Sequence, residues 1–249
     1  MSAGNLGMLS ILVKREFGSY FATPIAYVFI LIFLMLSGVF TFYIGNFYER
    51  GQADLTPFFS FHPWLYLFLV PAVSMRLWSE ERKSGSIELL MTLPITRRDV
   101  VVGKFLAAWF FTGIALLLTF PLWLTVNYLG DPDNGVVAAS YIGSWLMAGG
   151  FLAIGSCTSA MSKSQVIAFI LCGMVCLLFI LAGFPMVLGA FKGWLPTIFV
   201  DTLASLSFLT HFSAISKGVL SLKDVFYFLS MIIVWLLATM VVVDLKQGE

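Results

Sequence analysis

The sequence predicts an all-α membrane protein with six transmembrane helices, an amphipathic N-terminal helix in the membrane interface and a short helix in a cytoplasmic loop. The first observation is composition, because 60% of the 249 residues are hydrophobic and 11% are charged, whereas soluble domains carry about 25% charged residues. The second is a series of apolar runs long enough to cross about 30 Å of hydrocarbon. The third is the uneven placement of Lys and Arg between these runs. The net charge of +1 does not indicate a nucleic-acid partner.

The six apolar runs are flanked by charged residues or by turn-forming sequences, such as the Gly-Asp-Pro-Asp-Asn-Gly stretch after the third run. They cover residues 24–46, 61–78, 105–129, 139–161, 166–189 and 225–243. The second run is the shortest and contains Pro71. Because proline removes a helix hydrogen bond, we expect this run to be broken or tilted.

The orientation follows from the Lys and Arg residues. If both termini lie on one side, that side holds Lys14, Arg15, Arg76, Arg82, Lys83, Arg97, Arg98, Lys104, Lys163 and Lys246. The other side holds Arg50, Lys192, Lys217 and Lys223. Since Lys and Arg are enriched in cytoplasmic loops, we expect both termini and the loop over residues 79–104 to be cytoplasmic. The first apolar run exceeds a typical signal-peptide core, and we expect it to be retained.

Residues 6–21 are too few to span a membrane, but they have the period of an amphipathic helix. At about 100° per residue, one side carries Leu9, Leu12, Val13, Phe17, Tyr20 and Phe21, and the other carries Ser10, Lys14, Arg15 and Gly18. Such a helix lies in the membrane interface with its basic side toward headgroups and cytosol. A plain membrane anchor is the alternative to a more specific role.

Glu16 is a charged residue on the apolar side of this helix, beside Leu12 and Tyr20. A carboxylate in that position is costly unless it is paired. We therefore predict that Glu16 is bound to a cationic group or a helix end in the cytoplasmic loop between the second and third runs, with Arg82 or Arg76 as candidates. The alternative is a side chain that bends outward to water.

The 79–104 loop carries the densest charge in the chain, followed by a short apolar helical pattern. Ile87, Leu90 and Met91 stand at i, i+3 and i+4, and Pro94 ends the pattern. Exposed apolar side chains in a cytoplasmic loop usually mark an interaction site, and a short amphipathic helix in a partner's groove is a recurrent recognition mode. The alternative is that these side chains pack back on the N-terminal helix or on the membrane surface.

The end of the loop has the spacing of a capping box, in which an N-cap hydroxyl and an N3 acid bond to each other's backbone. Thr96 stands at the N-cap and Asp99 at N3, ahead of the third apolar run. We expect a helix to begin there.

The sequence indicates no catalytic site and no bound cofactor. A Walker A loop needs the pattern G-x-x-x-x-G-K-[ST], and the nearest match, Gly103-Lys104, is followed by Phe105 and has Arg98 where the first glycine belongs. The chain is therefore not an ATPase. No titratable residue lies near the centre of a predicted span, which argues against a proton- or ion-driven carrier.

Cysteines and histidines give no stronger signal. Cys172 and Cys176 are four residues apart in the fifth run, and two thiolates could bind a soft metal, but core cysteines at helical spacing are far commoner. With Cys157, all three cysteines lie in apolar segments, so a disulfide framework is not expected. His62 and His211 are single histidines near outer span ends, where pairing or exposure explains them more simply than ligation.

Three motifs together resemble the permease subunits of ABC-2 type transporters, and most closely the gliding-motility type of bacterial permease. The first is Lys14-Arg15-Glu16-Phe17 followed by Pro24-Ile25-Ala26-Tyr27. The second is Glu80-Glu81-Arg82-Lys83-Ser84-Gly85-Ser86-Ile87-Glu88-Leu89-Leu90-Met91-Thr92-Leu93-Pro94. The third is Phe208…His211-Phe212…Lys217-Gly218-Val219-Leu220…Asp224-Val225-Phe226-Tyr227. The resemblance covers nearly the whole chain.

The resemblance implies a six-span half-transporter of the bacterial inner membrane, with the fold of type V exporters. Residues 1–23 would form the cytoplasmic interfacial helix, and residues 24–249 the transmembrane domain with its coupling loop at 79–104 and an extracellular re-entrant region at 190–221. The helix that docks into a separate ABC ATPase would consist of Ser86, Ile87, Glu88, Leu89, Leu90, Met91 and Thr92. Glu16 and Arg82 would form the contact with the interfacial helix.

The implied function is that of a permease in an ATP-driven exporter. Its partners would be the ATPase, which binds the ATP and Mg²⁺, a second identical or related permease, and membrane lipid. The substrate is unknown, and an amphiphilic or polymeric one would suit the apolar spans. The alternative is a non-transporting complex that uses ATP to act on periplasmic accessory proteins.

Overall fold

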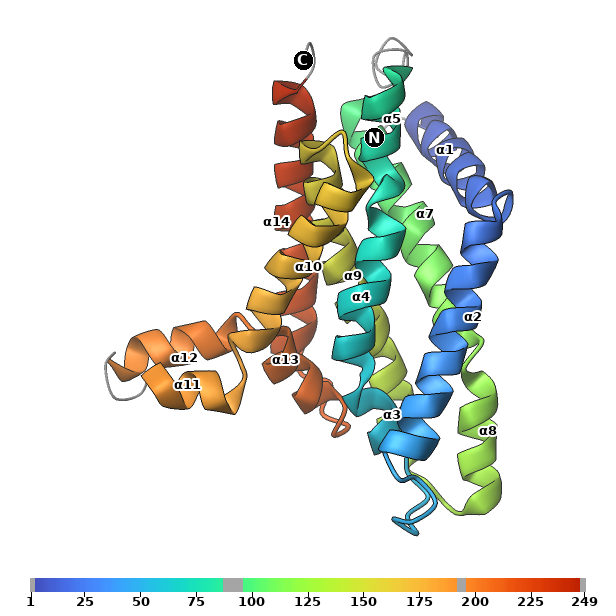
Figure 1. The fold of residues 1–249 in the computed structure, drawn as a ribbon, viewed down its shortest axis with the longest axis vertical. Helices are drawn as coiled ribbons and strands as arrows, with labels where there is room; N and C mark the ends of the chain where they lie inside the picture. The colour runs from blue at the N-terminus through green and yellow to red at the C-terminus, as the bar shows by residue number, and fades with distance from the viewer. Residues whose placement is uncertain (1–2, 87–95, 192–195, 247–249) are drawn as a thin grey trace.

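The computed structural model describes residues 3–86, 96–191 and 196–246, in which every regular element is helical (Figure 1). The N-terminal half comprises α1 (Ala3–Phe21), α2 (Pro24–Val39), the π-helix η1 (Phe40–Ile44), α3 (Thr56–Ser60), α4 (His62–Ser74), α5 (Arg76–Ser84), α7 (Arg97–Leu117) and α8 (Phe120–Leu129). The C-terminal half comprises α9 (Asn134–Met161), α10 (Gln165–Leu181), α11 (Pro185–Phe191), α12 (Thr197–Ser205), α13 (Phe208–Ile215) and α14 (Leu222–Leu245). The all-helical class is as predicted.

The bundle is organised around α9, which packs against α14, α10, α4, α7, α5 and α13. Small residues allow this close approach. A Cβ atom added at Gly155 would lie 2.0 Å from the Ser74 hydroxyl oxygen, and one at Gly150 would lie 2.8 Å from the Phe208 ring. Since van der Waals packing holds helices together in lipid, these glycines fix the distance of α9 from its neighbours.

Four helical segments are long and apolar enough to cross a membrane: Pro24–Ile44, Arg97–Leu129, Asn134–Met161 and Leu222–Leu245. They match the first, third, fourth and sixth predicted runs. The bent pair of α12 and α13, at 65°, is a further candidate for one broken span. The protein is thus a multi-pass membrane protein.

The second and fifth predicted runs are interrupted. The second is divided between α4 and α5 at Met75, after Pro71, which agrees with the expected break. The fifth was predicted as one helix to residue 189, but α10 ends at Leu181 and a new helix begins at Pro185. Proline disfavours helical backbone in the residue before it, and this explains the break that the hydropathy pattern did not show.

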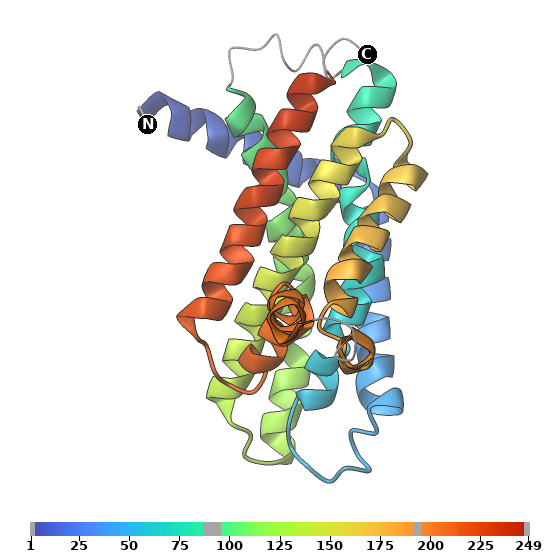
Figure 2. The ribbon, with the colours of Figure 1, turned by 90° about the vertical axis from the view of Figure 1, so that its left-hand side faces the viewer.

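Helix α1 lies crosswise to the bundle at the end that also holds the C-terminus and the two borders of residues 87–95 (Figure 2). Arg97 at the start of α7 pairs with Asp244 near the end of α14, with 2.7 Å between Nη1 and Oδ1. Both described ends of the chain therefore share one end of the bundle, as the Lys and Arg placement predicted. In the half of the bundle away from this end, α11 and α12 extend sideways (Figure 1).

Candidate functional site

The apolar side of α1 packs against the first turns of α7. Leu12 is buried, and a Cβ atom added at Gly103 would lie 2.6 Å from its Cδ2 atom, so a residue without a side chain makes room for it. Tyr20 stacks on Phe111 with 5.0 Å between ring centroids. These contacts confirm the predicted amphipathic helix and show that its apolar side packs on α7.

Glu16 projects from this apolar side and is paired. One carboxylate oxygen lies 2.5 Å from Arg15 Nη2, and the other lies 3.2 Å from Lys104 Nζ. Burial raises the pKa of Glu16, but the nearby charges of Lys104 and Arg15 and their hydrogen bonds outweigh it, so the pKa lies below its ordinary value. Glu16 is therefore ionised at neutral pH.

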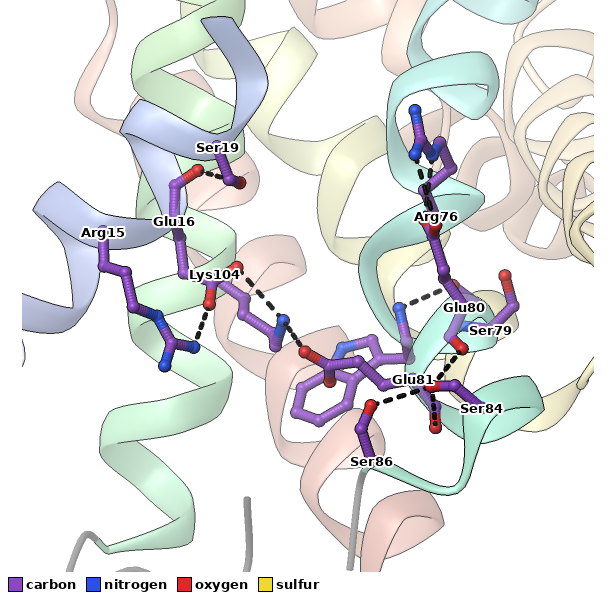
Figure 3. A network of polar contacts seen from close by, with 12 residues as sticks. Arg15, Glu16, Ser19, Arg76, Ser79, Glu80, Glu81, Ser84, Ser86 and Lys104 are labelled. Carbon is purple, nitrogen blue, oxygen red and sulfur yellow. Dashed lines mark hydrogen bonds and ion pairs between the residues drawn. The ribbon is translucent and has the colours of Figure 1, made fainter. Parts of the chain in front are cut away.

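Lys104 is the centre of the site. Its side chain is 3% exposed, and its ammonium group contacts both Glu16 and Glu81, the second at 2.7 Å (Figure 3). It also lies 5.6 Å from the ring centroid of Trp78, within the range of a cation–π contact. We name Glu16, Lys104 and Glu81 the charged junction. It joins α1, α7 and α5.

Helix α5 is held to α9 by hydroxyl groups. The Ser159 hydroxyl accepts hydrogen bonds from the backbone N–H groups of Trp78 and Ser79 at 3.1 Å and donates to the Met75 carbonyl at 2.8 Å. The Trp78 indole donates to Ser156 Oγ at 3.0 Å. These bonds satisfy backbone groups at the break between α4 and α5, where an unpaired group would be costly.

The predicted partner of Glu16 is wrong. Arg82 does not contact Glu16 but donates to the Ala160 carbonyl at 2.7 Å, because it lies on the side of α5 that faces α9. Arg76 pairs with Glu80 at 3.0 Å, one turn along its own helix. The expectation that Glu16 needs a cation is confirmed, but the cation is Lys104.

The sequence contains a signal that could have identified Lys104 as the partner of Glu16. On α7 the residues Val100, Lys104, Ala107 and Phe111 lie at helical spacing, and all four are buried. Lys104 is thus a lone cation in an apolar stripe, just as Glu16 is a lone anion in another. Two lone charges of opposite sign in apolar stripes are expected to pair when the stripes pack together.

The predicted coupling helix lies mainly outside the described residues, since Ile87, Glu88, Leu89, Leu90, Met91 and Thr92 belong to 87–95. The structure describes Ser86, whose hydroxyl lies 2.9 Å from that of Ser84. The two borders of the segment are clear. Helix α5 ends at Ser84 and is followed by its C-cap, Gly85, which has a left-handed φ of 73° suited to glycine.

The second border is the start of α7, where Thr96 is the N-cap. Its hydroxyl accepts from Asp99 N at 3.3 Å and donates to the Asp99 carboxylate at 2.6 Å. The predicted N-cap is confirmed, although the Asp99 carboxylate accepts from the Thr96 hydroxyl and not, as in a capping box, from its backbone. The charged junction therefore connects α5 and α7, the two helices that border residues 87–95, to each other and to α1.

The third motif forms a separate cluster at the other end of the bundle. His211 Nδ1 lies 2.6 Å from the Asp224 carboxylate, and Nε2–H donates to the Ser205 carbonyl at 2.9 Å. The His211 ring stacks on Tyr227 at 3.9 Å. The expectation that pairing explains His211 is confirmed. His62 is fully buried among aromatic rings, and neither nitrogen has a hydrogen-bond partner among the described residues.

Comparison with known proteins decides the family, since residues 11–245 match the sequence model of the ABC-2 family transporter proteins. The chain belongs to this family. A 70-residue stretch, 28% of the chain, is 37% identical to "Heme exporter protein B" of Rhodobacter capsulatus and covers 32% of that relative's length. The chain is thus a multi-pass membrane protein of a transporter family.

Proposed function

We propose that this chain is the permease subunit of an ATP-driven exporter in a bacterial inner membrane. It would cross the membrane six times, through α2, α4 with α5, α7 with α8, α9, α10 and α14, with both termini and the 79–104 loop in the cytoplasm. Residues 1–23 would be the interfacial element, and residues 24–249 the transmembrane domain. A separate ATPase would bind ATP and Mg²⁺, and a second identical or related permease would complete the complex.

The observation that carries this proposal is the position of Lys104. Its contacts with Glu16 and Glu81 join the three helices around residues 87–95. If the ATPase holds residues 86–92, its closure displaces α5 and α7 together, and α1 moves with them through the junction. The bundle then changes between two packings and opens a path at the interface with the second permease.

The substrate class follows from the apolar character of the spans. We propose an amphiphilic substrate, and the name of the Rhodobacter relative, a heme exporter, is consistent with this class. Residues 190–221 would form the outer re-entrant region, which contains α12 and α13. Their bend of 65° supports a segment that turns back within the outer part of the bilayer.

The test replaces a coupling residue with a charged one. Leu90→Asp or Met91→Asp places a carboxylate in the proposed contact, and we expect the ATPase that co-purifies with the wild-type chain from native membranes to be lost, with the unfolding temperature unchanged. Leu222→Asp is the control, because Leu222 is 89% exposed at the start of α14, far from the proposed contact. Retained co-purification of the Leu90 and Met91 variants would contradict the coupling role.

Transport is measured separately on the intact complex in vesicles. ATP-dependent movement of an amphiphilic substrate supports the exporter. Persistent ATPase activity without any movement supports a complex that acts on periplasmic proteins instead.

A further inference from the structure

A cavity of about 500 Å³ lies beside the charged junction, between α1 and α5. Six of its lining side chains are charged, namely Arg15, Glu16, Arg76, Glu80, Glu81 and Lys104. Three are cations and three are carboxylates, so their formal charges cancel. Figure 3 shows Lys104 between Glu16 of α1 and Glu81 of α5, with Arg15 beside Glu16 and Arg76 beside Glu80. A neutral ligand that carries both charges therefore enters this cavity at a lower electrostatic cost than a net anion or cation.

One carboxylate oxygen of the cavity lining lacks a hydrogen-bond partner among the described residues. Glu81 Oε1 contacts Lys104, but Glu81 Oε2 is buried and has no hydrogen-bond partner among the described residues. A buried acceptor without a donor is unfavourable by the desolvation of that atom. A ligand ammonium group with N–H donors would satisfy it, whereas a trimethylammonium group would not.

Two arginines in the cavity have donors to spare. Arg76 uses Nε and Nη2 on Glu80, and Arg15 uses Nη2 on Glu16. A guanidinium group carries five N–H donors, so the remaining ones on Arg15 and Arg76 are available to an anion. A phosphate is the anion for which arginine geometry is best suited.

The cavity lies next to the start of a membrane-crossing helix. Thr23, which lines it, directly precedes α2, and α2 exposes the apolar side chains of Ile25, Val28 and Leu31 over its first turns. A headgroup in the cavity would thus have an apolar surface below it for its acyl chains. This arrangement favours a membrane lipid over a soluble compound with the same headgroup.

We propose that the cavity binds the headgroup of a phosphatidylethanolamine-type lipid, with the primary ammonium on Glu81 and the phosphate on Arg76. The lipid would fill the space between α1 and α5 and support the charged junction. This site does not depend on the coupling role proposed above, since it needs neither the ATPase nor a transported substrate.

The experiment measures lipid binding to the purified full-length chain in detergent by native mass spectrometry. The probes are dioleoyl phosphatidylethanolamine, the corresponding phosphatidylcholine and the corresponding phosphatidylglycerol. We expect saturable binding of phosphatidylethanolamine at least about tenfold tighter than the other two, as the loss of one charge-assisted hydrogen bond predicts. Equal affinity for the three lipids, or a preference for phosphatidylglycerol, would overturn the proposal.

Two variants with matched controls locate the site. Ser19→Trp fills the cavity without removing an ion pair, and Ser10→Trp is its control, because both serines donate to the carbonyl three residues earlier on α1 but Ser10 does not line the cavity. Arg76→Gln removes a phosphate contact, and Arg50→Gln breaks a similar i,i+4 pair that does not line it.

We expect Ser19→Trp and Arg76→Gln to lower the phosphatidylethanolamine affinity about tenfold and the two controls to leave it unchanged, with all four unfolding as wild type in the absence of lipid. Unchanged affinity in Ser19→Trp would place the lipid elsewhere. Glycerophosphoethanolamine is added as a competitor. If it binds as tightly as the lipid, the ligand is soluble and the membrane assignment is wrong.

Discussion

The two ends of the bundle use buried charge in different ways. At the end with both termini, Lys104 joins residues 88 and 23 positions away, on two other helices, and a cavity lies beside it. At the opposite end, His211 pairs with Asp224, 13 positions away, and aromatic rings pack directly against it. The first arrangement connects distant parts of the chain and leaves space, and the second fixes a local corner. A junction that moves during transport would need both features, contacts between distant helices and free space beside them.

The largest effect expected is that of Lys104→Met, which leaves the Glu16 and Glu81 carboxylates without their shared cation. Removal of one partner from a buried ion pair costs about 3–5 kcal/mol, and here α1 should separate from α5 and α7. Thermal unfolding and hydrogen exchange of α1 measure both effects. Lys217→Met, at an exposed lysine near the other end, is the control.

A triple variant sharpens this prediction. If Glu16→Gln and Glu81→Gln are added to Lys104→Met, no charge of the buried junction is left unpaired, and most of the lost stability should return. If the triple variant is as unstable as Lys104→Met alone, unpaired charge is not the cause.

A smaller effect is expected from the same substitution at the two histidines. His211→Phe keeps an aromatic ring but removes the contacts of the imidazole with Asp224 Oδ1 and with the Ser205 carbonyl, a loss of about 1–3 kcal/mol. His62→Phe removes two nitrogens that have no hydrogen-bond partner among the described residues, so its stability should be unchanged or higher. The unfolding temperatures of the two variants measure this difference. An equal decrease in both would contradict the prediction that the His211 contacts stabilise the fold more.

The smallest effect is the pH dependence of the junction. Because the pKa of Glu16 is lower in the folded protein than its ordinary value of 4.5, its ionised form stabilises the fold above that value. This stabilisation is lost as the pH falls through the folded pKa. Protection of α1 amides, corrected for intrinsic exchange, should therefore decrease below about pH 4.5 more in wild type than in Glu16→Gln. An equal decrease of protection with falling pH in wild type and in Glu16→Gln would contradict this prediction.

Most of the fold was predictable because the apolar character of contiguous residues decides which segments lie in the membrane. Four of the apolar runs, the helix over residues 6–21 and the Thr96 cap each depend on contiguous residues, and the structure has a helix or a cap at each of these places. The end of α10 was missed because Pro185 lies within a run whose hydropathy is continuous. The effect of Pro185 on the backbone before it, and not hydropathy, sets the end of α10.

The site was only partly predictable, since its partners come from different helices. The need of Glu16 for a cation could be read from its own helix. The choice between Arg82, Arg76 and Lys104 depended on which side of α5 faces α9 and on where α1 crosses α7, and neither follows from local spacing. The coupling residues 87–92 remain a prediction.

The hydroxyl of Ser159 also has a consequence for biosynthesis. Ser159 follows Ser79 by 80 positions, yet it satisfies the backbone at the break between α4 and α5. While the ribosome is still producing the intervening segments, the Trp78 and Ser79 N–H groups lack the Ser159 acceptor, and backbone groups without partners enter lipid only at a cost. We therefore expect the α4–α5 segment to stay in the hydrated insertion channel, or close to it, until α9 emerges, so that the early and late helices leave the channel as one group.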